Sequence, residues 1–123
     1  MHRLPAALAV AALTLAVSAC GGDQPTTQTA EGSLLTMFQH DFYFDPQTVH
    51  AKPGRLTLQI VNRGRIPHNF RIEKGGREVG RTSALKPGQS ARVPVRLTRG
   101  DYHYYCSVGN HEELGLYGTL VVR

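Results

Sequence analysis

The residues best suited to chemistry lie near the C-terminus, where four residues separate Cys106 from His111. One further histidine of interest, His68, lies far upstream. A soft thiolate and two imidazole nitrogens suit a mononuclear copper site, because together in a trigonal plane they tolerate both Cu(I) and Cu(II). The three residues therefore predict one bound copper ion, and the natural use of such a site is to move single electrons.

The first residues predict export across a membrane. Residues 1–19 combine a positive start at Arg3 with an apolar run and small residues before Cys20, which is typical of a signal peptide. This run is shorter than the roughly 20 apolar residues of a membrane span. Residues 17–20 resemble a bacterial lipobox, which implies that Cys20 is acylated and begins the mature protein. The alternative is a secreted protein that is cleaved nearby and carries no lipid.

The number of cysteines favours a metal ligand at position 106. The chain has two cysteines, so Cys106 has no disulfide partner if Cys20 carries a lipid. A free thiol outside the cytoplasm is liable to oxidation, and binding to a metal protects it. This supports the assignment of Cys106 as a ligand.

Residues 20–33 are predicted to form a lipidated, flexible linker. After Cys20 the segment is polar and contains one alanine, a composition typical of disorder. Thirteen such residues have a mean reach of about 20 Å. We expect this linker to tether a folded domain, residues 34–123, to the outer, extracytoplasmic face of a membrane of the bacterial cell envelope.

The chain is mildly basic, with 14 lysines and arginines against 9 acidic residues. This balance favours acidic partners or anionic lipid head groups. Nucleic-acid binding is not expected, because the arginines are spread along the chain and no basic helix or aromatic stacking motif accompanies them. We expect a monomer that meets acidic redox partner proteins.

Alternation of apolar and polar residues runs through residues 34–123 and predicts β-strands. Turn signals separate these segments, and none has a convincing helical repeat. We expect an all-β, Greek-key, two-sheet β-sandwich of about seven to eight strands. Pro94 lacks an N–H donor and predicts an edge strand or a bulge. The apolar faces are predicted at Leu56, Leu58 and Ile60, at His68, Phe70 and Ile72, at Ala91, Val93, Val95 and Leu97, and at Tyr102, Tyr104 and Cys106.

The domain resembles the cupredoxins, the small blue-copper proteins that include plastocyanin, azurin, rusticyanin and halocyanin. The resemblance covers about residues 37–122 and depends on the order of several segments. These are residues 44–46, 52–54, 67–70 and 100–106, followed by His111 and residues 118–120. The resemblance implies one type 1 copper per domain, with His68, Cys106 and His111 as its equatorial ligands.

The same resemblance implies roles for the two residues beside His68. Asn69 corresponds to the polar residue next to the first histidine, which would tie the ligand loops together and donate a hydrogen bond toward the sulfur. The alternative for Asn69 is a plain strand residue that faces solvent. The carbonyl of Pro67 would approach the copper along its axis, as the equivalent carbonyl does in some relatives.

Leu116 departs from the family pattern, which usually places a methionine five residues after the second histidine as a weak axial ligand. Leucine has no donor atom, although some high-potential copper oxidase sites carry it and still bind copper. Without an axial donor Cu(II) is disfavoured relative to Cu(I), so Leu116 predicts a raised reduction potential. The alternative is a degenerate domain that binds no metal.

The leading hypothesis is a membrane-tethered carrier of single electrons. In relatives the C-terminal histidine reaches an apolar surface patch, which here would contain Ile66, Pro67, Leu114 and Leu116 around His111.

Other hypotheses fit the sequence less well. A module for copper delivery or resistance would need several methionines or histidines near the site, whereas Met37 stands alone in the predicted domain. An enzyme is not expected, because copper oxidases need further His-x-His pairs for a trinuclear centre and this sequence has none. Zinc would accept cysteine and histidine, but no fourth donor is found where the family pattern would place one. We find no argument that makes His40, His50 or His103 a ligand.

Overall fold

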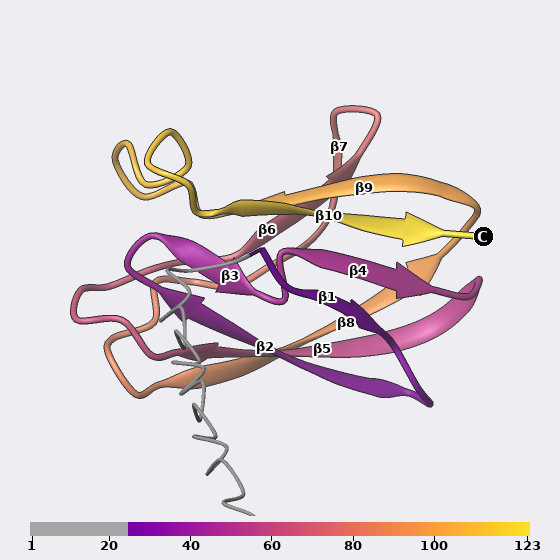
Figure 1. Cartoon of the computed structure of the whole chain (residues 1–123), viewed down its shortest axis with the longest axis horizontal. Helices are drawn as coiled ribbons and strands as arrows, with labels where there is room; N and C mark the ends of the chain where they lie inside the picture. Colours follow the sequence, from indigo (N-terminus) through magenta and orange to yellow (C-terminus); the bar gives the residue numbers. More distant parts are fainter. Residues whose placement is uncertain (1–24) are drawn as a thin grey trace, which may run out of the picture.

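Ten β-strands and no helix make up residues 25–123, the part of the chain that this computed structural model describes (Figure 1). The predicted signal peptide and Cys20 lie outside the described residues. The strands are β1 (Thr27–Thr29), β2 (Leu34–His40), β3 (Tyr43–Asp45), β4 (Thr48–Ala51), β5 (Gly54–Asn62), β6 (Arg71–Lys74), β7 (Arg77–Arg81), β8 (Ser90–Leu97), β9 (Gly100–Tyr105) and β10 (Tyr117–Val122). None of the described residues forms a helix of the length and apolarity needed to cross a membrane.

The strands form two sheets that pack as a sandwich, as predicted from the alternating pattern. One sheet has six strands in the order β1-β4-β10-β9-β6-β7, and the other has four in the order β3-β2-β5-β8. The total exceeds the expected seven to eight, since several strands have only three or four residues. The chain passes repeatedly between the sheets, so connecting loops gather at both ends of the sandwich (Figure 1).

The predicted linker, residues 20–33, is wrong in its C-terminal part, where β1 belongs to the fold. This strand pairs in parallel with β4. The N–H groups of Gln47 and Thr48 donate to the carbonyl of Thr26, and the N–H of Ala30 donates to the carbonyl of His50 at 2.8 Å. The side chains of β1 are exposed, so backbone pairing with an edge strand holds it and burial of apolar surface does not. A polar composition therefore did not reveal it.

The predicted apolar faces form the core between the sheets. All but one of their residues are buried, the exception being Ala91, which is half-buried. Tyr104 is the largest fully buried side chain, and its hydroxyl donates to the carbonyl of Pro46 at 2.9 Å. A Cβ at Gly118 would overlap the Tyr104 ring and the carbonyl of Gln47, so only glycine allows this packing.

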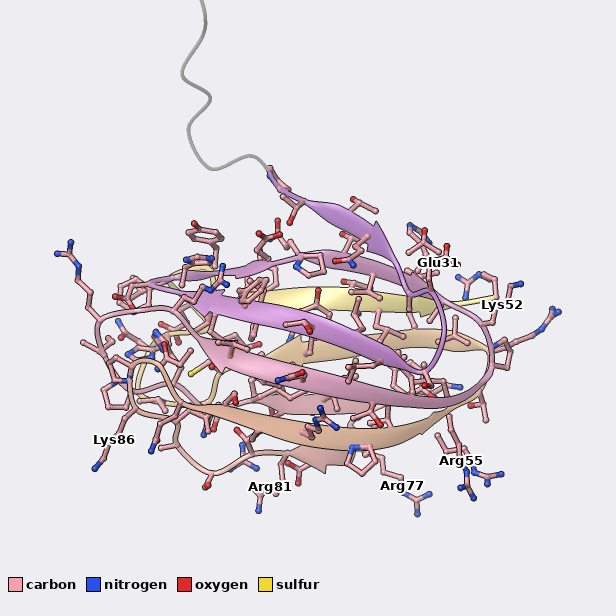
Figure 2. All side chains as sticks on the ribbon, turned by 90° about the horizontal axis from the view of Figure 1, so that it is seen from below. Glu31, Lys52, Arg55, Arg77, Arg81 and Lys86 are labelled. Carbon is pink, nitrogen blue, oxygen red and sulfur yellow. The ribbon has the colours of Figure 1, made fainter. Side chains whose placement is uncertain are left out.

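The β8 strand lies at the edge of its sheet, as Pro94 predicts, and its outer face is basic. Arg55 on β5 lies directly opposite Arg96 on β8, and Arg92 is exposed further along the same strand. Figure 2 shows Arg55 on the side of the molecule that lies away from β1.

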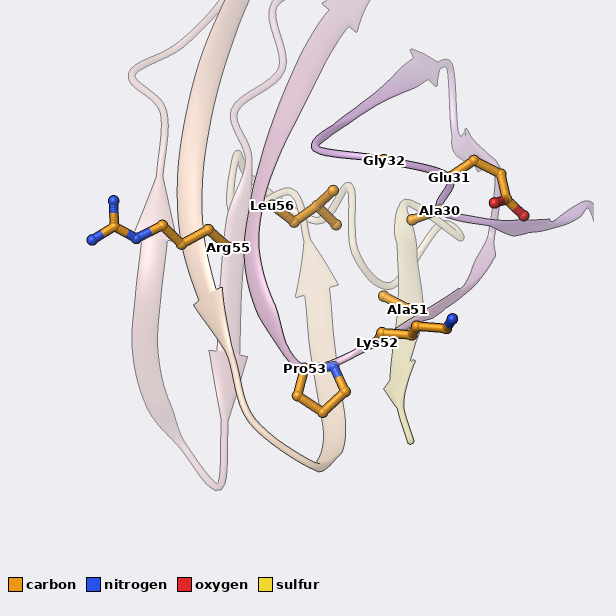
Figure 3. Close-up of a pocket in the computed structure, with 8 residues that line it drawn as sticks. All are labelled: Ala30, Glu31, Gly32, Ala51, Lys52, Pro53, Arg55 and Leu56. Carbon is orange, nitrogen blue, oxygen red and sulfur yellow. The ribbon is translucent and has the colours of Figure 1, made fainter.

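A shallow pocket lies at the end of the sandwich where β5 begins (Figure 3). Ala30, Lys52 and Leu56 are among the residues that line it, and it has no cysteine or histidine. Since β5 ends at Asn62, beside the loop that carries His68, this pocket lies at the other end from the predicted ligands.

Candidate metal centre

The structure brings the three predicted ligands together at one end of the sandwich. His68 follows β5 and forms an isolated β-bridge with Leu85, in which each residue donates its N–H to the carbonyl of the other. Cys106 comes directly after β9, and His111 lies in the turn that leads to β10. Two different loops therefore supply the ligands, and the end of the core beneath them is packed by residues of both sheets.

The donor atoms form a triangle of the size that a metal ion needs. The Nδ1 atoms of His68 and His111 are 3.1 Å apart, and the Cys106 Sγ lies 4.0 Å from the first and 3.6 Å from the second. A point equidistant from these atoms lies about 2.1 Å from each, which matches metal–nitrogen and metal–sulfur bonds of about 2.0–2.3 Å. Among residues 25–123 no other group of histidine, cysteine and acidic side chains converges in this way. One soft sulfur and two imidazoles in a plane fit copper.

The three ligands differ in their exposure to solvent. The side chains of His68 and Cys106 are fully buried, whereas His111 is partly exposed. Burial raises the pKa of the Cys106 thiol above its ordinary value, although the backbone N–H groups of Val108 and Asn69 partly oppose this. Burial also lowers the pKa of His111, as does the charge of a protonated His68. The metal-free site thus favours a neutral thiol, and metal binding must release its proton.

Asn69 joins the two ligand loops. Its side-chain Oδ1 accepts the N–H of Ser107 at 2.7 Å, and its Nδ2 donates to the Ser107 hydroxyl at 2.8 Å. The Asn69 group that faces the cysteine sulfur is the backbone N–H. The side chain therefore ties the loops in the way the resemblance implies, and the backbone supplies the contact with the sulfur.

Gln39 is a buried polar residue that the sequence reading did not single out. Its Nε2 donates to the carbonyl of Asn69 at 2.8 Å, which supports the first ligand loop from within the core. The alternation of the strand carried a signal, because Gln39 follows Leu35 and Met37 on the buried face of β2.

Asp41 is a second residue that sequence reasoning missed. It lies in the turn between β2 and β3, and its Oδ1 is 2.6 Å from the Nε2 of His68. The other carboxylate oxygen accepts the N–H of Arg65 at 2.7 Å. Although partial burial raises its pKa, the N–H of Arg65 and the side chain of His68 outweigh this effect and hold the pKa of Asp41 below its ordinary value. Nothing in the sequence linked this turn to His68.

Leu116 is fully buried beside the ligands. Its carbonyl accepts the N–H of Cys106 at 3.0 Å, and its N–H donates to the carbonyl of His111 at 3.1 Å. The prediction that Leu116 belongs to the apolar surface around His111 is therefore wrong, because Leu116 does not reach the surface. The axial placement of its side chain stays a prediction, as does the axial role of the Pro67 carbonyl.

The other three residues of the expected apolar surface belong to the segments that carry the ligands, since two directly precede His68 and one follows His111 by three positions. Ile66 and Leu114 are exposed, at 37% and 52%, and Pro67 is exposed too. Phe42 adds an aromatic ring that the sequence reading missed, with its centroid 5.0 Å from that of His111.

The other described histidines make contacts elsewhere. His40 stacks on Tyr43, His50 is exposed on β4, and His103 pairs with Glu112 at 2.8 Å. None belongs to the group of donor atoms at the site.

Comparison with known proteins gives one family and several similar structures. The model of a family described as the cupredoxin-like domain matches residues 6–122. An azurin from Methylomonas sp. strain J superposes with a TM-score of 0.65 at 16% identity, covering 76% of this chain and 99% of the azurin. Auracyanin A from Chloroflexus aurantiacus, described as a "blue" copper protein, has a TM-score of 0.65 at 18% identity and covers 73% and 98%.

A multicopper oxidase is also similar, with a TM-score of 0.60 at 21% identity. The alignment covers 73% of this chain but 41% of the oxidase. No curated protein matches the chain.

Proposed function

Since the chain belongs to the cupredoxin-like family and His68, Cys106 and His111 form its copper site, we propose that it carries single electrons. This proposal rests on the triangle formed by the two histidine Nδ1 atoms and the cysteine Sγ, whose centre lies about 2.1 Å from each of these atoms. A bound copper ion would supply the Cu(I)/Cu(II) couple. The chain's own part is to hold the donors in one arrangement for both states.

Contacts around the ligands support this rigid arrangement. The β-bridge to Leu85 fixes the backbone of His68, and the side chain of Asn69 fixes Ser107 beside Cys106. The hydrogen bonds of Leu116 hold the ends of the loop that contains Cys106 and His111. Donors that are already in place need little reorganisation when the charge of the metal changes, which favours rapid electron transfer.

His111 is the ligand through which we propose that electrons pass. It is the one partly exposed ligand, the ring of Phe42 packs against it, and the exposed Ile66 and Leu114 lie on the two ligand loops. A partner docked on this patch would exclude water and approach the metal through the imidazole ring.

Burial of the site argues against a role in copper delivery. The alignment with the multicopper oxidase covers less than half of that protein, which limits the comparison. A delivery module must release its metal readily, whereas Cys106 and His68 are fully buried. The chain corresponds to less than half of the multicopper oxidase, so we do not extend that protein's activity to it and propose no enzymatic function.

A copper titration tests the proposed function. We expect purified protein carrying Cys20→Ser, which removes the proposed acylation site, to bind one equivalent of Cu(II) and turn intensely blue through a thiolate-to-copper band. The colour should disappear on reduction, return on reoxidation and give a reversible one-electron wave in voltammetry. Protein that stays colourless, or that binds copper without reversible redox chemistry, would contradict the proposal.

We further propose that acylated Cys20 anchors the protein in the bacterial cell envelope. Because backbone hydrogen bonds hold the chain to the fold from Thr26 onward, the segment from Cys20 to Thr26 spans at most about 22 Å. A close tether of this kind would hold the domain near the membrane. In the native host, Cys20→Ser should move the protein from the membrane fraction to the soluble fraction, with Ser18→Ala as a matched control. Unchanged membrane association of Cys20→Ser would contradict lipidation.

An acidic protein is the proposed redox partner. Arg55, Arg92 and Arg96 lie on one face of the four-stranded sheet, and none has an ion pair among the described residues. Their charge should accelerate association with an acidic partner, an effect that salt screens. We expect electron transfer with an acidic cytochrome to slow as ionic strength rises, and to slow at low salt in Arg55→Gln/Arg96→Gln. A rate that is independent of salt would exclude this partner class.

A further inference from the structure

We infer that Asp41 is a positioning residue of the copper site, whose carboxylate sets the tautomer and orientation of His68 and whose charge favours Cu(II). The effect on copper rests on the proposed function, whereas the effect on His68 applies also to the metal-free protein. The inference depends on the contact between Asp41 Oδ1 and His68 Nε2 at 2.6 Å.

The geometry assigns a different task to each ring nitrogen of His68. Its Nδ1 lies 3.1 Å from the Nδ1 of His111 and 4.0 Å from the sulfur of Cys106, so this atom faces the metal position. An ionised carboxylate only accepts hydrogen bonds, so the Nε2 that faces Asp41 must carry a proton. The lone pair of a neutral ring then lies on Nδ1, where a metal can bind it. Asp41 therefore selects the tautomer that copper needs.

Neighbouring groups hold the carboxylate in this position. The N–H of Arg65 donates to Oδ2 at 2.7 Å, which leaves Oδ1 for His68. Gly64 provides the space, because a Cβ there would overlap Oδ1 and would lie 2.8 Å from the His68 Nε2. The side chain of His68 is fully buried and that of Asp41 is 21% exposed, so little water screens the contact.

The charge of Asp41 acts on the metal through the imidazole. A carboxylate that accepts a hydrogen bond from the Nε2–H group makes the ring a stronger electron-pair donor at Nδ1. A stronger donor and a nearby negative charge both stabilise Cu(II) more than Cu(I), so they lower the reduction potential. This effect opposes that expected from Leu116. Among the described residues no carboxylate bonds to the ring of His111, so the two histidines differ as donors.

Asp41→Asn tests the role of the charge. Asparagine keeps the size of the side chain and a carbonyl acceptor for His68 but removes the negative charge. Affinity for Cu(II) should fall about 10- to 100-fold, which is typical for groups that support a metal-binding histidine. If Cu(I) affinity is unchanged, each tenfold loss raises the potential by about 59 mV. Asp45→Asn is the matched control, because Asp45 accepts a hydrogen bond from Thr26 and is not a partner of His68. Equal shifts in both variants would overturn the role of the charge.

The metal-free protein gives a readout that does not depend on copper. In ¹⁵N NMR spectra of the neutral imidazole, we expect His68 to carry its proton on Nε2 in the parent and in Asp45→Asn. Asp41→Ala should lose this preference and populate both tautomers. An unchanged tautomer in a folded Asp41→Ala would overturn the positioning role. If the parent protein binds no copper, the proposed function fails, while this measurement still decides whether Asp41 orients His68.

Gly64→Ala displaces the carboxylate without removing its charge. The added methyl group would overlap Oδ1, so Asp41 must move away from His68. We expect the same loss of Cu(II) affinity and of tautomer preference as in Asp41→Ala, with the overall fold checked by circular dichroism. A folded Gly64→Ala protein with parental affinity and parental tautomer would show that the contact does not position the ligand.

Discussion

Replacing Cys106 with serine should abolish the blue colour completely. The intense visible band of such a site arises from transfer of charge from a thiolate to copper, and a hydroxyl group cannot supply it. Cys106 is also the one soft donor among the three ligands, so affinity for Cu(I) should fall most. Absorption spectra of Cu(II)-loaded parent and variant give the first result, and competition with a Cu(I) chelator gives the second.

The same β-strand offers a control for this substitution. His103 lies on β9, three residues before Cys106, and it pairs with Glu112 and is not one of the three donor residues. His103→Gln should therefore keep the full band. The Cys106→Ser protein should still fold, since serine can accept the backbone N–H groups of Val108 and Asn69 that face the sulfur. A Cys106→Ser protein that stays blue would refute the assignment of the ligands.

Leu116→Met should lower the reduction potential by about 60 mV, which corresponds to a tenfold gain in affinity for Cu(II) relative to Cu(I). Leu116 is fully buried, and its backbone bonds directly to both Cys106 and His111. Leucine and methionine have similar volumes, so the exchange should cost little in packing. If the side chain lies over the axial face of the copper, the thioether adds a weak donor that stabilises Cu(II). Voltammetry of parent and variant measures the shift.

Leu120→Met provides the matched control for this experiment. Leu120 is another fully buried leucine, located on β10 beyond the loop of the ligands, and it pairs with Tyr102 across the sheet. The same change in chemistry there should leave the potential unaltered. A potential that is unchanged or higher in Leu116→Met would mean that Leu116 serves only in the core.

Asp41 and Leu116 should affect the potential in opposite directions and through different atoms. The proposed effect of Asp41 passes through the Nε2 of His68, whereas the expected effect of Leu116 is that it offers no donor if it lies on the axial side. We therefore expect the potential of the parent to reflect a balance that the residue at position 116 alone does not predict. Asp41→Asn should raise the reduction potential above that of the parent, to a value set mainly by the absence of an axial ligand.

Patterns in the sequence were enough to predict the sandwich and all three ligands. A strand alternates its side chains between two faces, so the positions of Leu56, Leu58 and Ile60 already determined which face is buried. Four residues separate Cys106 from His111, and a short turn can therefore bring both to one ion. Pro94 likewise predicted an edge strand, because the missing N–H is a property of the residue itself.

The tertiary structure decided the contacts between distant segments. His68 is 38 residues from Cys106 and 27 from Asp41, and no local pattern relates these positions. Their meeting depends on which strands pair and where the loops cross, so the link between Asp41 and His68 needed the fold. The pairing of β1 with β4 depends on the same cause, since backbone hydrogen bonds with an edge strand carry no signature in side-chain composition. The sequence thus specified the donor set and the buried faces by itself, while the partners that orient the donors arise only from the packing of loops at one end of the sandwich.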